Sequence, residues 1–209
     1  IRGFAMMMRD NLIKNDLKST DKYLEMIIEQ TDRMSKIIKN IKSFSHQGAY
    51  NFFPSDIKKP ITDALMLVES QLKFNGIELI LEFADNTPVF KMDSLKLQQV
   101  FLNLLQNSID ALENTGDKMQ IRIKTEFLKK QEKIKIYFYD SGKGIKEEII
   151  NEIFNPFFTT KSPDKGTGLG LPISMTIIKD HGGSIQVNSI LGEGATFIIE
   201  LPIQKTFNN

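Results

Sequence analysis

The first 48 residues restrict the possible folds more than any other part of the sequence. They contain no proline, and their only glycines are Gly3 and Gly48. From Asp21 to Ser45, apolar residues recur at helical spacing along a seam, and a second apolar row widens it. The seam consists of Leu24, Ile27, Met34, Ile38 and Ile41 with Thr31 and Ser45, and the second row of Tyr23, Ile28, Ile37 and Phe44. So broad a stripe indicates a helix in a bundle.

A shorter apolar-faced helix is predicted over residues 1–14, and the polar stretch Asn15–Ser19 allows a turn between the two. Because a lone hairpin cannot bury so much apolar surface, we expect residues 1–48 to form a four-helix bundle in a homodimer. The alternative is that the hairpin packs on the rest of the chain. The sequence begins at Ile1, already in a helical pattern, so we expect it to be a piece of a longer protein.

The remainder of the chain predicts a second domain, 56–205, after a linker at 49–55. Helices are expected at about 56–74, 94–113, 146–154 and 171–180, and strands at 77–83, 120–127, 134–140, 184–189 and 195–201. Apolar residues share one face of each central strand: Ile121, Ile123 and Phe127, then Ile134, Ile136 and Phe138. Helices should therefore cover one face of a mixed sheet, and the fold class is α+β.

Composition excludes several function classes. The 27 Lys and Arg residues nearly balance the 26 Asp and Glu residues, so bulk charge favours neither nucleic acid nor an acidic membrane as a partner. The absence of cysteine excludes disulfides, thiol catalysis and cysteine metal sites, and is consistent with a reducing compartment. No apolar run approaches the roughly 18 residues of a membrane span, and no signal peptide is recognisable.

The predicted helix at 94–113 carries the first chemically informative pattern. Asn103, Asn107 and Asp110 fall on one narrow polar face, opposite an apolar face. Asparagine is a mediocre helix former, so two on one face require a reason. Amide oxygens are neutral, hard ligands that suit Mg²⁺ when phosphates already balance its charge. The alternative is an ordinary solvated face.

A second pattern, Asp140-Ser141-Gly142-Lys143-Gly144, follows the strand at 134–140. Asp140 continues the inward face of that strand, where a carboxylate needs hydrogen-bond donors. The amino group of adenine is such a donor, whereas guanine presents an oxygen at that position. The two glycines permit a tight turn that a ligand can approach closely. A turn with an internally satisfied aspartate is the alternative.

Two further glycine patterns follow. Gly166, Gly168 and Gly170 alternate in the run 165–171 before a predicted helix, and exposed N–H groups with a helix N-terminus favour polyphosphate. The spacing matches neither a Walker loop nor a dinucleotide-binding G-x-G-x-x-G. The run 192–197 is a glycine turn that enters a strand. Each pattern alone is compatible with a structural turn.

In this order, the patterns resemble those of sensor histidine kinases and of the wider ATPase superfamily that includes type II topoisomerases, Hsp90-type chaperones and MutL-type repair proteins. Residues 98–107 resemble the N box, 140–144 the G1 box, 154–161 the F box, 166–170 the G2 box and 192–197 the last glycine motif. His181-Gly182-Gly183 also matches. The Phe-Phe-Thr-Thr-Lys run at 157–161 favours the kinases, because the topoisomerases and chaperones lack it.

The resemblance implies that ATP and Mg²⁺ are the ligands. Asn107 is implied as the direct Mg²⁺ ligand, Asn103 as a second contact near the phosphates, and Lys161 as a side chain that reaches toward them. Asp140 is implied to accept from the adenine amino group. The other implied nucleotide contacts are Asp110 and Ala111 near ribose and base, Gly142, Gly144 and Ile145 around the base, Gly166, Thr167, Gly168, Leu169 and Gly170 in a mobile lid over the triphosphate, and Leu171 and Thr196.

By the same resemblance, the chain is expected to be the catalytic part of a two-component sensor kinase. It would transfer the γ-phosphoryl group of ATP to a histidine, for relay to an aspartate on a response-regulator receiver domain. The family's acceptor lies upstream of the residues resembling 1–9. His46 and His181 occupy other positions, and His181 is expected to be structural, with a charge that suits a helix C-terminus. This chain alone is therefore expected not to phosphorylate itself.

Two other functions stay open at this point: a dimerisation module whose ATP site only regulates partner binding, and a protein-serine kinase of the anti-sigma type. Intact Asn107 and Asp140 argue against the first, and the N-terminal hairpin argues against the second. We expect a cytoplasmic location, in a membrane-anchored or a soluble sensor, without contact of this part with nucleic acid or membrane.

Overall fold

The chain forms two compact units. The computed structural model describes residues 1–203 except 15, 46–49, 114, 117–118 and 163–165, and for 32–33 and 36–45 it describes the backbone alone. One unit comprises Ile1–Gln47 and Thr160–Thr167, and the other comprises Gly48–Thr159 and Gly168–Asn209. Within the described residues, no helix combines the length and the apolar character needed to cross a membrane.

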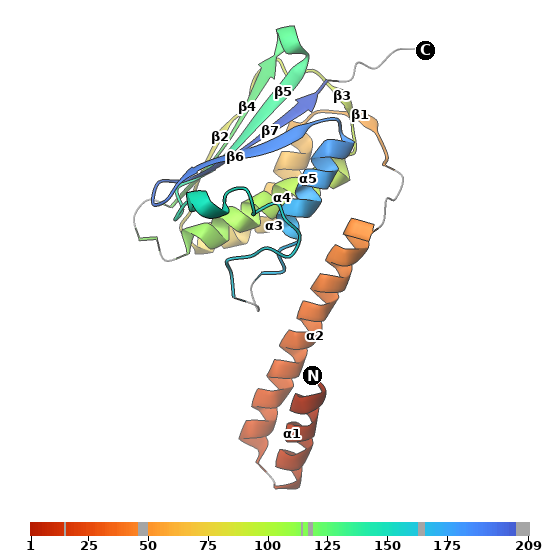
Figure 1. The fold of residues 1–209 in the computed structure, drawn as a ribbon, viewed down its shortest axis with the longest axis vertical. Coiled ribbons are helices and arrows are strands. Elements are labelled where there is room, and N and C mark those ends of the chain that lie inside the picture. Colours follow the sequence, from red (N-terminus) through yellow and green to blue (C-terminus); the bar gives the residue numbers. More distant parts are fainter. Residues whose placement is uncertain (15, 46–49, 114, 117–118, 163–165, 204–209) are drawn as a thin grey trace. The chain divides into compact units, whose positions relative to one another are not determined.

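The first unit contains a helical hairpin of α1 (Arg2–Ile13) and α2 (Leu17–Ser45), shown in Figure 1. The rings of Phe4 and Tyr23 stack between the two helices, with centroids 6.4 Å apart. The second helix begins at Leu17, four residues earlier than predicted. The reason is Asp16, whose carboxylate accepts the Ser19 N–H at 3.1 Å and so caps the helix N-terminus.

The second unit is a mixed sheet with helices on one face, as predicted (Figure 1). The strand order is β2-β4-β5-β7-β6, in which β2 is parallel to β4 and every other neighbour is antiparallel. The strands are β2 (Glu78–Glu82), β4 (Gln120–Leu128), β5 (Lys133–Asp140), β6 (Ser184–Ile190) and β7 (Gly194–Pro202), and the helices are α3 (Lys58–Phe74), α4 (Ser94–Leu112) and α5 (Gly170–Asp180).

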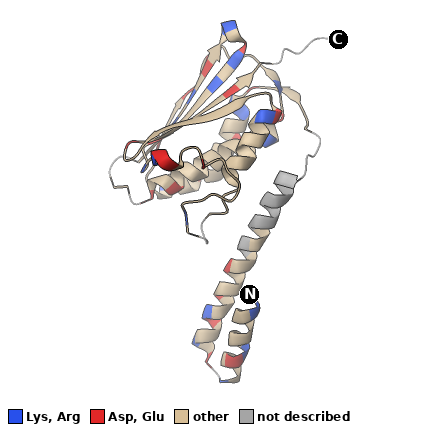
Figure 2. Ribbon diagram, in the orientation of Figure 1, with Lys and Arg blue, Asp and Glu red and all other residues tan. Residues whose placement is uncertain are grey.

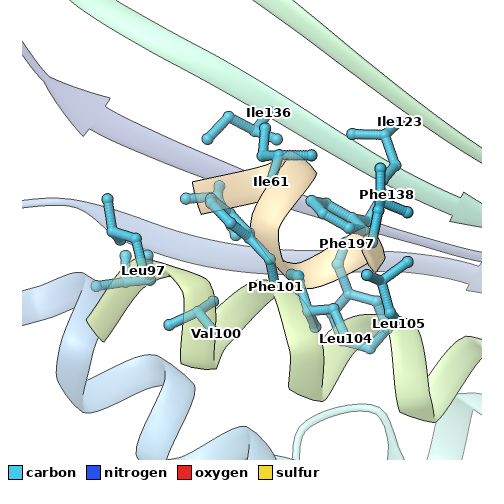
Figure 3. Close-up of a cluster of buried hydrophobic side chains, with 14 of the residues drawn as sticks. Ile61, Leu97, Val100, Phe101, Leu104, Leu105, Ile123, Ile136, Phe138 and Phe197 are labelled. Carbon is cyan, nitrogen blue, oxygen red and sulfur yellow. The ribbon is translucent and has the colours of Figure 1, made fainter. Parts of the chain in front are cut away.

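The core lies between α4 and the sheet. Figure 3 shows side chains of α4 directed at those of the strands, among them Phe101 and Phe138, whose rings stack with centroids 5.5 Å apart. Both side chains are fully buried. The apolar face of α4 and the inward face of each central strand thus meet as their periodicities predicted, and this contact fixes which side of α4 remains for chemistry.

The outer face of the sheet is polar. Charged residues are spread over β4 and β5 in Figure 2, and Lys133 and Lys135 both reach the Glu200 carboxylate of β7, at 3.3 and 2.9 Å. Burial along β5 alternates strictly, with Ile134, Ile136, Phe138 and Asp140 on the inward side. The chemistry-bearing Asp140 therefore lies on the helix-covered face.

Two elements differ from the sequence predictions. The expected linker contains β1 (Phe53–Ser55), which pairs antiparallel with β3 (Phe90–Met92), and neither strand was predicted. Three-residue strands are too short to show a period, so this pairing is decided by tertiary contacts. The segment 146–154 is not an α-helix but a 3₁₀ turn, Glu147–Ile149, followed by turns with hydrogen bonds between residues three apart.

A buried histidine joins the ends of two helices. His181 follows α5, and its Nδ1–H donates to the Ile177 carbonyl at 2.7 Å, while its Nε2 accepts the backbone N–H of Asp93 at 3.1 Å. Burial lowers the pKa of His181, against smaller opposing effects of these neighbours. His181 is thus structural, but it is neutral, and the expected charge at the helix end was wrong. The ring packs on Tyr50 and Phe52, which anchors the segment before α3.

Candidate nucleotide-binding site

A buried carboxylate at the end of β5 is the centre of the candidate site. Asp140 is 3% exposed, and burial raises its pKa to about 6. Hydrogen bonds oppose this shift: Asp140 Oδ1 accepts the Gly142 N–H at 3.0 Å, Oδ2 accepts the Ser108 hydroxyl at 3.3 Å, and the Ala195 N–H contributes a third. A carboxylate has about four acceptor positions, so it can accept one further donor such as an amino group.

The loop after Asp140 lies between α4 and the β6–β7 turn. A side chain at Gly142 would meet Asp140 Oδ1 at 2.7 Å and the Ala111 Cβ at 2.8 Å, and the Lys143 N–H donates to the Ala111 carbonyl at 3.3 Å. Gly144 has a φ of +68°, and a Cβ there would overlap the Ile190 carbonyl oxygen. These glycines are therefore required by close approach of the chain to itself, beside any role toward a ligand.

The predicted polar face of α4 is present. Asn103, Asn107 and Asp110 are half-buried, and the Gln106 amide donates to Asp110 Oδ1 at 3.0 Å. Ser108, on the same helix, is a residue that sequence reasoning missed. It is a lone serine among apolar positions, and only the register of α4 against β5 brings its hydroxyl to Asp140.

The start of α5 lies against the same helix. Asn103 Nδ2 donates to Ser174 Oγ at 3.0 Å, and a Cβ at Gly170 would overlap Asn103 Oδ1. The predicted N-box asparagine and the end of the predicted G2 loop are therefore in direct contact. Leu171 is half-buried at the beginning of the helix.

The segments that resemble the F box and the G2 box close onto each other. The Phe157 N–H donates to the Gly168 carbonyl at 2.9 Å, and Gly168 has a φ of +65° with its Cα against the Phe157 backbone. Leu169 is 2% exposed and belongs to the core, so a contact of this residue with a nucleotide must use its backbone.

The remaining predicted site residues are placed less directly. Lys161, Gly166 and Thr167 belong to the compact unit that contains the hairpin, where the Gly166 N–H donates to Ser162 O at 3.2 Å; their nucleotide contacts stay predictions. Ile145 donates its N–H to Ser189 Oγ at 2.8 Å, beside the loop. His46 and Lys165 lie outside the described residues.

Thr196 lies on the other face of the sheet from Asp140. Asp140 pairs with Ala195 and Tyr139 pairs with Thr196, so Thr196 alternates with the inward residues Ala195 and Phe197. This placement gives no support to a side-chain contact of Thr196 with a base held by Asp140.

The fold and the site together define a nucleotide-binding domain. A three-helix layer covers one face of a mixed sheet, a buried acceptor ends the central strand β5, and a helix with an amide-bearing face passes beside it.

Residues 92–205, more than half of the chain, match the family of histidine kinase-, DNA gyrase B- and HSP90-like ATPases, and the chain belongs to this family. It is also similar, at 35% identity and a TM-score of 0.62, to the solved catalytic domain of the histidine kinase ThkA, over 73% of this chain and 96% of that one. The resemblance to sensor histidine kinases is thereby confirmed.

Longer relatives match the hairpin as well. The signal transduction histidine-protein kinase AtoS of Escherichia coli K12 is 32% identical over 209 residues, which is 100% of this chain and 33% of AtoS. The sensor histidine kinase TmoS of Ectopseudomonas mendocina is 32% identical over 181 residues, which is 86% of this chain and 18% of TmoS. The chain thus spans a third or less of these two relatives. A structure of ThkA in complex with the response regulator TrrA matches 97% of this chain and 56% of that chain, at 30% identity and a TM-score of 0.75.

Proposed function

We propose that this chain is the catalytic region of a two-component sensor histidine kinase. It binds ATP with Mg²⁺ and transfers the γ-phosphoryl group to a histidine imidazole, from which the group passes to an aspartate of a receiver domain. The observation that carries the proposal is Asp140, a buried acceptor at the end of β5 in a domain of the histidine kinase ATPase family.

Asp140 selects the base. Its carboxylate has one acceptor position beyond those used by its protein donors, and it lies beside the compact turn at Gly142. The adenine amino group donates to this acceptor, whereas the guanine oxygen at the same position is repelled. A site built around such an acceptor discriminates strongly, because the wrong base covers the carboxylate and leaves its remaining acceptor position without a donor.

Asn107 and Asn103 suit the cation. Both are half-buried on the polar face of α4, and amide oxygens are the hard, neutral donors that Mg²⁺ takes together with phosphate oxygens. Asn107 is proposed as the direct ligand and Asn103 as the second contact. Bound Mg²⁺ would neutralise charge on the β- and γ-phosphates.

Phosphoryl transfer requires mainly positioning and charge stabilisation from the protein. The bond between the γ-phosphorus and the β–γ bridging oxygen breaks, an imidazole nitrogen forms the new bond to phosphorus, and ADP leaves with the bridging oxygen. The charge of Lys161 and the backbone N–H groups of 166–170 are proposed to stabilise the transferred group. The second step moves the phosphoryl group from the imidazole nitrogen to an aspartate oxygen of the receiver domain.

Two partners follow from the same proposal. Several apolar side chains of the hairpin are about half exposed in one chain, for example Met7 at 52% and Ile28 at 53%, which supports a homodimer through residues 1–48. The likeness to ThkA, which was solved with TrrA, supports a response-regulator receiver domain as the phosphoryl acceptor.

The proposal is tested by mixing this chain with a homologous chain that carries the family's acceptor histidine and an inactivated nucleotide site. With γ-labelled ATP and Mg²⁺, we expect acid-labile, base-stable label on the histidine-bearing chain. Asp140→Asn in this chain should abolish the label. Label that is stable to acid, or that persists in the Asp140→Asn variant, would refute phosphohistidine formation by this site.

A further inference from the structure

A side-chain hydrogen bond joins α4 and α5 beside the candidate cation site. Asn103 Nδ2 donates to Ser174 Oγ at 3.0 Å, and Ser174 Oγ donates to the Gly170 carbonyl, one turn earlier in α5, at 3.0 Å. Ser174 is 1% exposed, so water does not compete for its hydroxyl. This buried hydroxyl was not among the residues that the sequence pointed to.

The hydroxyl decides which way the amide of Asn103 faces. A serine hydroxyl has one proton and two acceptor positions, and the proton of Ser174 is used on Gly170 O. Ser174 can therefore only accept from Asn103, and the amide must present its nitrogen to α5. The amide oxygen then faces the Cα of Gly170, where a Cβ would overlap it. Glycine at position 170 leaves space for this oxygen because it has no Cβ.

We propose that Ser174 is a positioning residue of the nucleotide site, which holds the Asn103 amide with its oxygen toward Gly170. An oxygen in this place attracts a cation, whereas an amide nitrogen would repel the cation and donate to phosphate instead. Ser174 thereby makes Asn103 a contact for the cation rather than for the phosphates. This inference rests on the proposed function, because it assumes that Mg-ATP binds beside α4 and the beginning of α5.

A matched control exists on the same helix. The hydroxyl of Thr176 donates to the Pro172 carbonyl at 3.1 Å, the same bond to the preceding turn that Ser174 makes, but Thr176 is exposed and faces away from α4. Thr176→Val therefore removes a hydrogen bond within α5 but keeps the hydrogen bond between Asn103 and Ser174.

Calorimetric titration of the full chain with ATP, with and without Mg²⁺, tests the proposal. We expect Ser174→Ala to weaken Mg-ATP binding about five-fold, or about 1 kcal/mol, and to leave metal-free ATP binding unchanged. Ser174→Cys should fall between, since sulfur is a weaker acceptor. Thr176→Val should bind as the unmodified chain does. In an Asn103→Ala background, Ser174→Ala should add nothing, because its effect passes through that amide.

The outcomes distinguish a wrong proposed function from a wrong role for Ser174. If the unmodified chain binds no Mg-ATP, the proposed function itself is wrong. If it binds, but Ser174→Ala weakens ATP equally with and without Mg²⁺, or adds its full effect to Asn103→Ala, Ser174 does not position the amide and the proposed function stands. Melting temperatures of all variants within a few degrees of one another exclude loss of folded protein as the cause, and Ser174→Cys supplies the comparison if Ser174→Ala does not fold.

Discussion

Replacing Asp140 with Asn is expected to stabilise the nucleotide-free protein while it abolishes most ATP binding. The carboxylate is almost fully buried, and this burial raises its pKa from 3.8 to about 6. A raised carboxyl pKa means that the folded state disfavours the charge. Since one pKa unit corresponds to about 1.4 kcal/mol, holding the ionised form at neutral pH costs about 3 kcal/mol of stability.

Asparagine removes this charge and keeps most of the hydrogen bonds. Its oxygen has two acceptor positions, enough for the Gly142 and Ala195 N–H groups, and its amide nitrogen can donate to Ser108 once that hydroxyl turns, so no buried group is left without a partner. A net gain of about 2 kcal/mol at pH 7 is therefore expected, which raises the melting temperature of a domain this size by about 4–8 °C. The affinity for Mg-ATP should fall about 100-fold, because adenine loses a charged acceptor.

The two proteins should also differ in how their stability depends on pH. Between pH 3.8 and about 6 the folded state binds more protons at Asp140 than the unfolded state does, so the contribution of this group to stability rises as the pH falls through that window. The advantage of the Asn variant should therefore shrink from pH 7 to pH 4. Urea titrations of both proteins across this range, with calorimetry at pH 7, measure the effects. An Asn variant that is less stable at pH 7, or an advantage that does not change with pH, contradicts the reasoning.

Three further outcomes are expected. Asn107→Ala should lose Mg²⁺-dependent ATP binding at an unchanged melting temperature, measured by calorimetry, because the side chain lies opposite the core; equal Mg-ATP affinity would move the cation site elsewhere. Gly144→Ala should cost about 2 kcal/mol or more in urea, because its φ is +68° and the new Cβ overlaps the Ile190 carbonyl; a smaller loss shows that the turn adjusts freely. The 209-residue chain should be a dimer through residues 1–48 without labelling itself from ATP, and light scattering that gives a monomer at micromolar concentration would exclude the dimer.

Much of the second unit could be predicted from the sequence because its elements are long and strongly periodic. The apolar faces of α4 and β5 meet in the core as their spacings of 3.6 and 2 residues require, and the same alternation places Asp140 on the inward side. The predicted helix end at 74 matches α3, which ends at Phe74 and is followed by Gly76 with a φ of +65°. The motifs of the candidate site could be placed in the fold for the same reason, because they stand at the ends of helices and strands that the sequence predicts.

Weak local signals explain the misses. The segment 146–154 has a helix-like apolar spacing, but its nine residues lie between Gly144 and Pro156 and form only a 3₁₀ turn and further turns. The strands β1 and β3 have three residues each and exist through their mutual pairing. The early start of α2 depends on the Asp16 cap, a signal that was present in the sequence and was overlooked.

The sequence by itself determined the fold class, the inward direction of Asp140 and the polar face of α4. These features depend on the spacing of apolar residues within each element and on the order of the elements along the chain, and both can be read from the sequence. Tertiary structure alone decided that Ser108 reaches Asp140, that Ser174 holds the Asn103 amide, and that His181 is neutral. Each of these depends on residues 32–88 positions apart that meet only when helices and strands pack together. Proton placement and amide orientation arise from such contacts, since a lone hydroxyl or imidazole carries no signal of the partner that folding will bring to it.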